Sequence, residues 1–213
     1  MDGVLTKPAK SARKAKGDGH LRRAEILEAA ERIFVAEGYE GATIRKIADE
    51  VGVSSTALYM HFPDKDAILH EICQGAMQTL LDQNTEIAGR PDDSVTRIRL
   101  ILEAYVRMGL EHPNAYRLVY CSPPPRNGAL GPIQAATREI GEQCYARYAG
   151  VVREIEAEGR LRAGDAESAA LALWAACHGL VALMITRPDI KWTPTDQLIR
   201  LTVKGLLHGH ISR

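Results

Sequence analysis

Three hydroxyl side chains stand together at the start of a short predicted helix. Ser54, Ser55 and Thr56 follow the turn residue Gly52. Ser54 suits the N-cap position, because its hydroxyl can accept a hydrogen bond from a free amide of the first helical turn. The short side chains of Ser55 and Thr56 can approach the edge of a base closely and can donate or accept hydrogen bonds there. These two residues are therefore candidates for reading a base sequence.

The residues before this helix complete a helix-turn-helix pattern. A helix is predicted from its N-cap Thr43 to Val51, and Gly52 ends it. A capped helix, a turn with glycine and a second short capped helix have the order of a DNA-binding helix-turn-helix. In that arrangement the second helix lies in the major groove, while neighbouring side chains hold phosphates and fix the register. Arg45, in the first turn of the first helix, could reach a phosphate or a base.

This segment resembles the DNA-binding segment of the TetR family of transcriptional regulators. The likeness lies in G-Y-x-x-x-T at 38–43, I-A-x-x-x-G-V-S at 47–54 and L-Y-x-H-F-x-x-K at 58–65. It implies that Tyr59 and His61 contact phosphates, and that a small molecule releases a homodimeric repressor from a palindromic operator. One recognition helix of about two turns reads few bases, so geometry also favours a two-fold dimer on double-stranded DNA.

We expect eight residues to bind DNA: Thr43, Arg45, Ser54, Ser55, Thr56, Tyr59, His61 and Lys65. Thr43 and Ser54 act first as N-caps, and Lys65 opens the next helix, from which its ammonium could reach the DNA backbone. Lys46 departs from the capping-box pattern, since an acidic residue at its position would complete the box with Thr43. We expect a nearby phosphate to compensate this cation.

Helical periodicity covers the chain from His20 onward, and no segment alternates as a β-strand would. The fold class is therefore predicted as all-α, with about nine helices. They are expected at 20–37, 43–51, 54–62, 65–87, 94–111, a short segment from Pro113, 132–158, 165–186 and 194–210. We expect a three-helix helix-turn-helix domain at 20–65 and a larger ligand-binding and dimerisation domain at 66–213.

Residues 1–19 are predicted to form a basic flexible arm. The chain has no net formal charge, yet residues 1–23 hold seven basic side chains against two acidic ones. This asymmetry favours a polyanionic partner at the N-terminal end. The same segment is polar and lacks the apolar stretch of a secretory signal, so we expect a cytoplasmic protein.

The apolar second half suits an interface between two copies of the chain. Ser168–Thr186 carries no formal charge and is nearly long enough to span a bilayer. Its many alanines and its central His178-Gly179 favour a buried helix over a membrane span. We expect the dimer surface on the last two long helices, with apolar contacts from Leu171, Trp174, Leu180, Leu183, Leu198, Leu201, Val203 and Leu206.

Two segments of this half resemble a TetR subgroup with a W-H-G element, namely 111–120 and 159–180, the latter with W-x-x-x-H-G from Trp174 to Gly179. The resemblance implies a ligand cavity among the middle helices. Its candidate lining combines aromatic and thioether groups with a few polar ends: Met77, Tyr105, Met108, Tyr116, Tyr120, Cys121, Tyr145, Trp174 and His178. His178 could orient a polar ligand or could be a structural histidine.

Patterns for catalysis or for a bound cofactor are absent from the sequence. We find no glycine-rich phosphate loop, no H-E-x-x-H, no nucleophile elbow and no carboxylate cluster with metal spacing. Cys177 and His178 are adjacent on a helix and point about 100° apart, which makes a poor catalytic pair. The four cysteines contain no C-x-x-C pair, so we expect free thiols and no zinc site. A thiol- or metal-responsive regulator using Cys121, Cys144 or Cys177 stays an open alternative.

Overall fold

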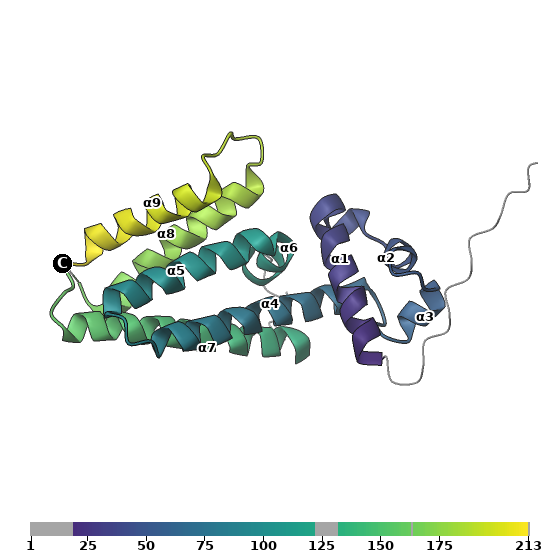
Figure 1. Cartoon of the computed structure of the whole chain (residues 1–213), viewed down its shortest axis with the longest axis horizontal. Coiled ribbons are helices and arrows are strands. Elements are labelled where there is room, and N and C mark those ends of the chain that lie inside the picture. The colour runs from purple at the N-terminus through teal and green to yellow at the C-terminus, as the bar shows by residue number, and fades with distance from the viewer. Residues whose placement is uncertain (1–18, 122–131, 163, 213) are drawn as a thin grey trace, which may run out of the picture. The chain divides into compact units, whose positions relative to one another are not determined.

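The computed structural model describes residues 19–121, 132–162 and 164–212. It divides the chain into two compact units, Met1–Leu69 and His70–Arg213. The predicted basic arm at 1–19 lies outside the described residues, apart from Gly19. The described residues form nine α-helices and no strand, so the predicted all-α class is confirmed (Figure 1).

The N-terminal unit contains α1 (Gly19–Gly41), α2 (Ile44–Glu50) and α3 (Ser55–Tyr59), and α4 (Lys65–Ala88) begins within it. Gly38 breaks the helical geometry of α1 with φ 74°, a conformation that glycine adopts at little cost, where the sequence predicts the helix to end. α1 packs against α2, and α2 packs against α3. Their apolar faces form the core of the unit, with the buried side chains of Ile26, Ala30, Phe34, Ile47, Leu58 and Phe62.

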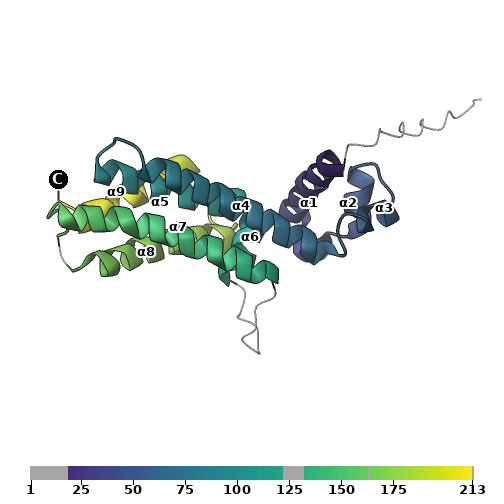
Figure 2. The ribbon, with the colours of Figure 1, turned by 90° about the horizontal axis from the view of Figure 1, so that it is seen from below.

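The C-terminal unit is a bundle with α5 at its centre. It contains most of α4, then α5 (Ser94–Glu111), α6 (Pro113–Tyr116), the π-helix η1 (Arg117–Cys121), α7 (Pro132–Ala157), α8 (Ala166–Thr186) and α9 (Thr195–His210). α5 contacts α6, α7, α8 and α9. Figures 1 and 2 show α7, α8 and α9 running alongside it. The short helix predicted from Pro113 is confirmed. The π-helix that continues it was not predicted, because five residues are too few to show a period.

One described helix, α8, is long and apolar enough to cross a membrane by length and composition alone. In this structure it packs against α5, α7 and α9. Leu173, Cys177 and Val181 are fully buried in the core of the unit, while Leu171 and Leu183 on the same helix are exposed. The uncharged sequence of α8 thus serves one buried face and one exposed apolar face.

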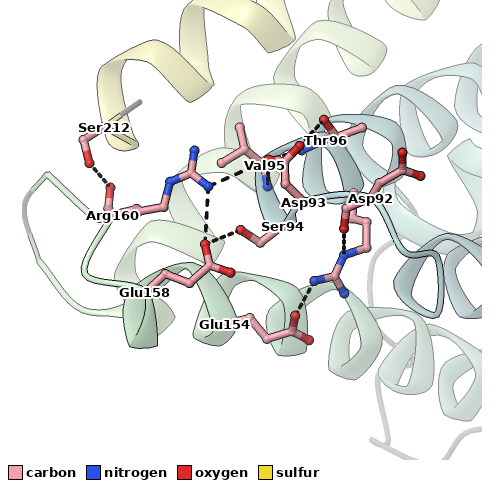
Figure 3. A network of polar contacts seen from close by, with 10 residues as sticks. Asp92, Asp93, Ser94, Val95, Thr96, Glu154, Glu158, Arg160 and Ser212 are labelled. Atoms are coloured by element: carbon pink, nitrogen blue, oxygen red, sulfur yellow. Dashed lines mark hydrogen bonds and ion pairs between the residues drawn. The ribbon is translucent and has the colours of Figure 1, made fainter.

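Polar contacts fasten the start of α5 to the end of α7 (Figure 3). Asp93 caps α5 by accepting hydrogen bonds from the amides of the first turn. The hydroxyl of Thr96, which donates to Asp93 Oδ2 at 2.7 Å, and these amides lower the pKa of the Asp93 carboxyl. Ser94 donates a hydrogen bond of 2.7 Å to Glu158 Oε2. Arg97 pairs with Glu154 and donates to two main-chain carbonyls before α5. These polar contacts hold the start of α5 against the end of α7. They therefore add to the apolar core in fixing the positions of these helix ends.

α5 and α8 approach each other closely at Gly109. A Cβ atom at this position would lie 2.6 Å from Val181 Cγ1 and 2.9 Å from Tyr116 Cδ2, both shorter than real Cβ contacts. Both neighbours are fully buried and cannot move aside freely. This contact was not predicted from the sequence, since a glycine inside a helix signals a close approach only when its partner is known.

The variant Gly109→Ala should destabilise the protein by about 1–3 kcal/mol, because it overpacks a close helix contact. Gly75→Ala is the matched control, since Gly75 is also helical and a Cβ atom added there would meet no other atom within 4 Å. The control should be neutral or stabilising by up to about 1 kcal/mol through helix propensity. Urea unfolding would measure both, and equal stabilities of the two variants would contradict this account.

Candidate DNA-binding and effector sites

The helix-turn-helix has the local geometry that the sequence predicts. Thr43 Oγ1 accepts a hydrogen bond of 3.2 Å from the amide of Lys46, and Ser54 Oγ accepts one of 3.1 Å from the amide of Ala57. Gly52 between the two helices has φ 69°, a turn conformation that favours glycine. Both caps are thus made as expected, and they fix where α2 and α3 begin.

The candidate base-reading and phosphate-binding side chains differ in accessibility. Thr56 is exposed and Ser55 is half-buried at the start of α3. The Tyr59 side chain is 54% exposed, and the Arg45 side chain is 87% exposed beside Asp49. His61 is half-buried. Apart from Ser55 and His61, these groups are open to a ligand, and their contact with DNA stays a prediction.

Two arginines counted as part of the basic N-terminal segment bind within the unit instead. Arg22 donates a hydrogen bond of 3.2 Å to the carbonyl of Val51 at the end of α2. Arg23 donates one of 2.6 Å to the carbonyl of His61, and its guanidinium lies 4.0 Å from the ring centroid of Phe62. They join α1 to the ends of the two helices that carry the candidate DNA contacts. Sequence reasoning missed this role, because a carbonyl partner leaves no mark in the sequence.

The ammonium groups of Lys65 and Lys46 have partners within the protein. Lys65 Nζ donates a hydrogen bond of 3.0 Å to the carbonyl of Tyr39 and lies 4.0 Å from the centroid of its ring. Lys46 Nζ donates to the carbonyl of Gly41 at 3.0 Å and pairs with Glu37. The carboxylate of Glu37 compensates this cation within the protein, and a phosphate beside Lys46 stays a prediction.

The C-terminal unit contains a partly open cavity of about 700 Å³ between α4, α5, η1, α7 and α8. Four predicted residues line it: Tyr105, Tyr120, Tyr145 and Trp174. Their rings follow one another across the wall, with centroids 6.1 Å apart for Tyr105 and Tyr120, 6.3 Å for Tyr120 and Trp174, and 5.8 Å for Trp174 and Tyr145. The size and the aromatic wall suit a small organic ligand.

Four other predicted lining residues do not reach the cavity: Met77, Met108, Tyr116 and His178. Met77, Met108 and Tyr116 are buried in the core, and they fill the spaces between helices behind the wall. Helical period identifies the apolar face of a helix, but it does not separate the residues that meet a neighbour from those that meet a void. The side chain of Cys121 lies outside the described residues.

His178 is held by tyrosines rather than aimed at a ligand. Its Nδ1 lies 3.2 Å from Tyr105 Oη and makes a short hydrogen bond with Tyr116 Oη. The tyrosine hydroxyls lie 3.2 Å from each other. Burial raises the pKa of Tyr105 and lowers the pKa of His178, so both are neutral near pH 7. Of the two roles that the sequence left open, the structural one fits these contacts.

Several wall residues were not predicted: His70, Asn84, Thr137, Arg138, Glu142, Tyr148 and Glu167. Glu167 Oε1 accepts a hydrogen bond of 2.9 Å from Tyr145 Oη, and Arg138 pairs with Glu142 one helical turn away. Asn84 is 3% exposed on a helix of otherwise apolar buried residues. A polar residue at a core position of α4 was the available signal for Asn84.

Comparison with known proteins identifies the chain. Residues 26–72 match "Bacterial regulatory proteins, tetR family", and residues 98–212 match "Tetracyclin repressor-like, C-terminal domain". The chain belongs to the TetR family. Proteins of this family are transcriptional regulators that bind DNA and form homodimers, and their fold is typically non-enzymatic. The finer resemblance to the W-H-G subgroup stays a prediction.

Curated relatives and solved structures agree with this family. The chain is 29% identical over 181 residues to the nucleoid occlusion factor SlmA of Vibrio vulnificus, covering 82% of this chain and 89% of the relative. The ketosteroid transcriptional regulator KstR2 of Mycobacterium tuberculosis has a TM-score of 0.69 at 22% identity over 90% of this chain and 96% of its own. A transcriptional regulator from Saccharomonospora viridis in complex with choline has a TM-score of 0.72 at 24% identity over 91% of this chain and all of its own.

The last two helices of this TetR-family chain expose apolar side chains, as a dimer surface would. Leu171 and Leu183 on α8 and Leu201 on α9 are between 46% and 58% exposed. Trp174, Leu180, Leu198 and Leu206 are half-buried. Val203, which we expected at the dimer surface, is fully buried in the core of its own unit. The prediction that Val203 lies at the dimer surface is therefore wrong, because Val203 is on the face of α9 that packs inward.

The buried thiols of the chain give little support to a thiol sensor. Cys73, Cys144 and Cys177 are buried, and none of them forms a disulfide with another described cysteine. Burial raises the pKa of Cys144 to about 11 and that of Cys177 to about 12. The reactive form of cysteine is the thiolate, which such pKa values disfavour at neutral pH. No group of three potential metal ligands occurs among the described residues.

The variant His178→Asn should lose a pH-dependent part of the stability. Because burial lowers the pKa of His178, the unfolded chain binds its proton more tightly than the folded chain. The contribution is complete above the unfolded pKa of about 6.5 and decreases as the pH falls through that value. The difference in Tm between wild type and variant should therefore shrink from about pH 8 to about pH 5. A constant difference would contradict the assignment.

Proposed function

We propose that this TetR-family regulator is a repressor that binds a palindromic operator as a homodimer and leaves it when a small molecule fills the cavity. One observation supports the proposal above all. The same chain contains an accessible, capped recognition helix, α3, and a cavity of about 700 Å³. α4 links the two, since it begins six residues after α3 ends and its later residues line the cavity.

The proposed release requires a difference in affinity. A ligand shifts the equilibrium only when it binds the DNA-incompetent conformation more tightly than the competent one. Cys73, Leu80 and Asn84 of α4 lie in the cavity wall, so a ligand can favour one placement of this helix. The similar folds of a ketosteroid regulator and of a regulator in complex with choline support a small molecule as the effector.

The DNA contacts of the proposal are assigned to two groups. Ser55 and Thr56 read base edges from the start of α3, and Tyr59 and His61 hold phosphates. Arg45 reaches a phosphate or a base. The ammonium of Lys65 already binds the carbonyl of Tyr39. Lys65 therefore contributes to DNA binding by holding α1 against the start of α4 and by raising the local positive charge. The basic arm at 1–19 adds phosphate contacts, which steepen the salt dependence of binding.

The variant Thr56→Ala should change which sequence is preferred, because a lost base contact costs about 1–3 kcal/mol at one base position only. Tyr59→Phe should instead weaken binding to all sequences by a similar factor, since a phosphate contact carries no sequence information. Selection of bound DNA from random sequence and fluorescence anisotropy would measure the two effects.

The matched control is Thr79→Ala, which removes an exposed hydroxyl bonded only to the Gly75 carbonyl of its own helix. It should leave both preference and affinity unchanged. If selection with the wild-type protein enriches no palindrome, the proposed function is wrong.

The variant Leu201→Glu should dissociate the dimer, because it places a charge at the most exposed leucine of α8 and α9. Val35→Glu is the control, since Val35 is a similarly exposed apolar residue in the other unit. Sedimentation velocity should find a monomer for the first variant and a dimer for the second. A dimer in both cases would place the interface elsewhere.

A further inference from the structure

The short helix α3 has one buried face and one exposed face. Leu58 is fully buried in the core of the N-terminal unit. Successive residues of an α-helix are turned by about 100° about its axis, so Thr56 and Met60 both lie within about 20° of the direction opposite Leu58. Met60 still has helical dihedral angles, φ −70° and ψ −19°. Thr56 and Met60 therefore form the centre of the exposed face.

Met60 is the most prominent apolar group on this exposed face. Ser55 is turned by only about 60° from Leu58, and it is half-buried. Met60 is 84% exposed, more than any other large hydrophobic side chain among the described residues. Single exposed apolar residues are common on protein surfaces, but this one lies at the centre of the face that a recognition helix turns toward DNA.

The chemistry of Met60 restricts what it can contact. Its thioether sulfur is a weak acceptor and the side chain has no donor, so Met60 cannot recognise a base through strong hydrogen bonds. Its long, unbranched and polarizable side chain adapts its shape to an apolar neighbour. An apolar contact is therefore the interaction that Met60 can offer to DNA.

The major groove contains one group that suits such a contact. Guanine, adenine and cytosine present hydrogen-bonding atoms there, whereas thymine also presents its C5 methyl group. Contact between this methyl group and Met60 removes apolar surface from water, which is favourable. The polar edge of another base would lose water beside Met60 without gaining a partner. Met60 at this place therefore favours thymine.

We propose that Met60 reads a thymine in each half of the operator by apolar contact with its C5 methyl group. The inference rests on the proposed function in that α3 enters the major groove. Thr56 and Met60 are about 6 Å apart along the helix, and consecutive base pairs are about 3.4 Å apart. The thymine that Met60 reads thus lies within about two base pairs of the base that Thr56 reads.

The test removes single methyl groups from DNA bound to the full-length protein. The wild-type protein first selects its operator from random sequence. Each thymine of that operator is then replaced in turn by deoxyuridine, which lacks the methyl group and keeps every hydrogen-bonding atom of the base edge. Fluorescence anisotropy should find one position in each half-site at which the replacement weakens binding about fourfold, the factor expected for one buried methyl group.

The variant Met60→Ala links this loss to Met60. It should bind the operator more weakly and should no longer distinguish thymine from deoxyuridine at that position. Its Tm should equal that of the wild type, because the Met60 side chain is exposed. Met60→Leu should keep the distinction, since it retains an apolar side chain. The matched control is Val35→Ala, which shortens an exposed apolar residue of the same unit and should leave affinity and distinction unchanged.

Three results would overturn the inference and, with a selected palindrome, leave the proposed function standing. They are a wild-type protein indifferent to every replacement, an equal loss in the wild type and in Met60→Ala, and a Met60→Ala variant that weakens binding to all sequences by the same factor. A selected site without two-fold symmetry that shows the same dependence on Met60 would contradict the proposed function and leave the inference standing. Absence of sequence-specific binding would overturn both.

Discussion

The close approach of α5 and α8 at Gly109 is the contact on which the C-terminal unit depends. The missing side chain lets Val181 of α8 and the ring of Tyr116 pack against the backbone of α5. Tyr116 then reaches His178 and Tyr105 with its hydroxyl. The aromatic residues that line the cavity are positioned by this arrangement, because Tyr105 precedes Gly109 by one turn of α5. A side chain at Gly109 would separate the helices and displace the wall.

The N-terminal unit depends on hydrogen bonds from cations to main-chain carbonyls. Arg22, Arg23, Lys46 and Lys65 each donate to a carbonyl at a helix end or in a turn. Helix ends leave such carbonyls without helical partners, and cationic donors satisfy them well. A small unit with little apolar core gains rigidity in this way. Its basic residues therefore serve the fold as well as the attraction of DNA.

The cavity wall is mainly apolar and aromatic, and it includes one buried polar residue of α4. Most of its wall is aromatic or apolar, and its tyrosine hydroxyls are paired within the protein. Asn84 alone keeps a buried oxygen without a partner among the described residues.

The sequence by itself determined the all-α class, the N-caps at Thr43 and Ser54, and the family. These features follow from local rules, because caps, turns and helical period depend on residues a few positions apart. Only the tertiary structure decided that Tyr105 and Tyr120 line the cavity while Tyr116 lies behind them, and that Val203 packs inward. It also placed Asn84 in the cavity wall and gave Lys46 and Lys65 partners within the protein. Each of these outcomes depends on which residue of a distant helix stands opposite, and local patterns do not contain that information.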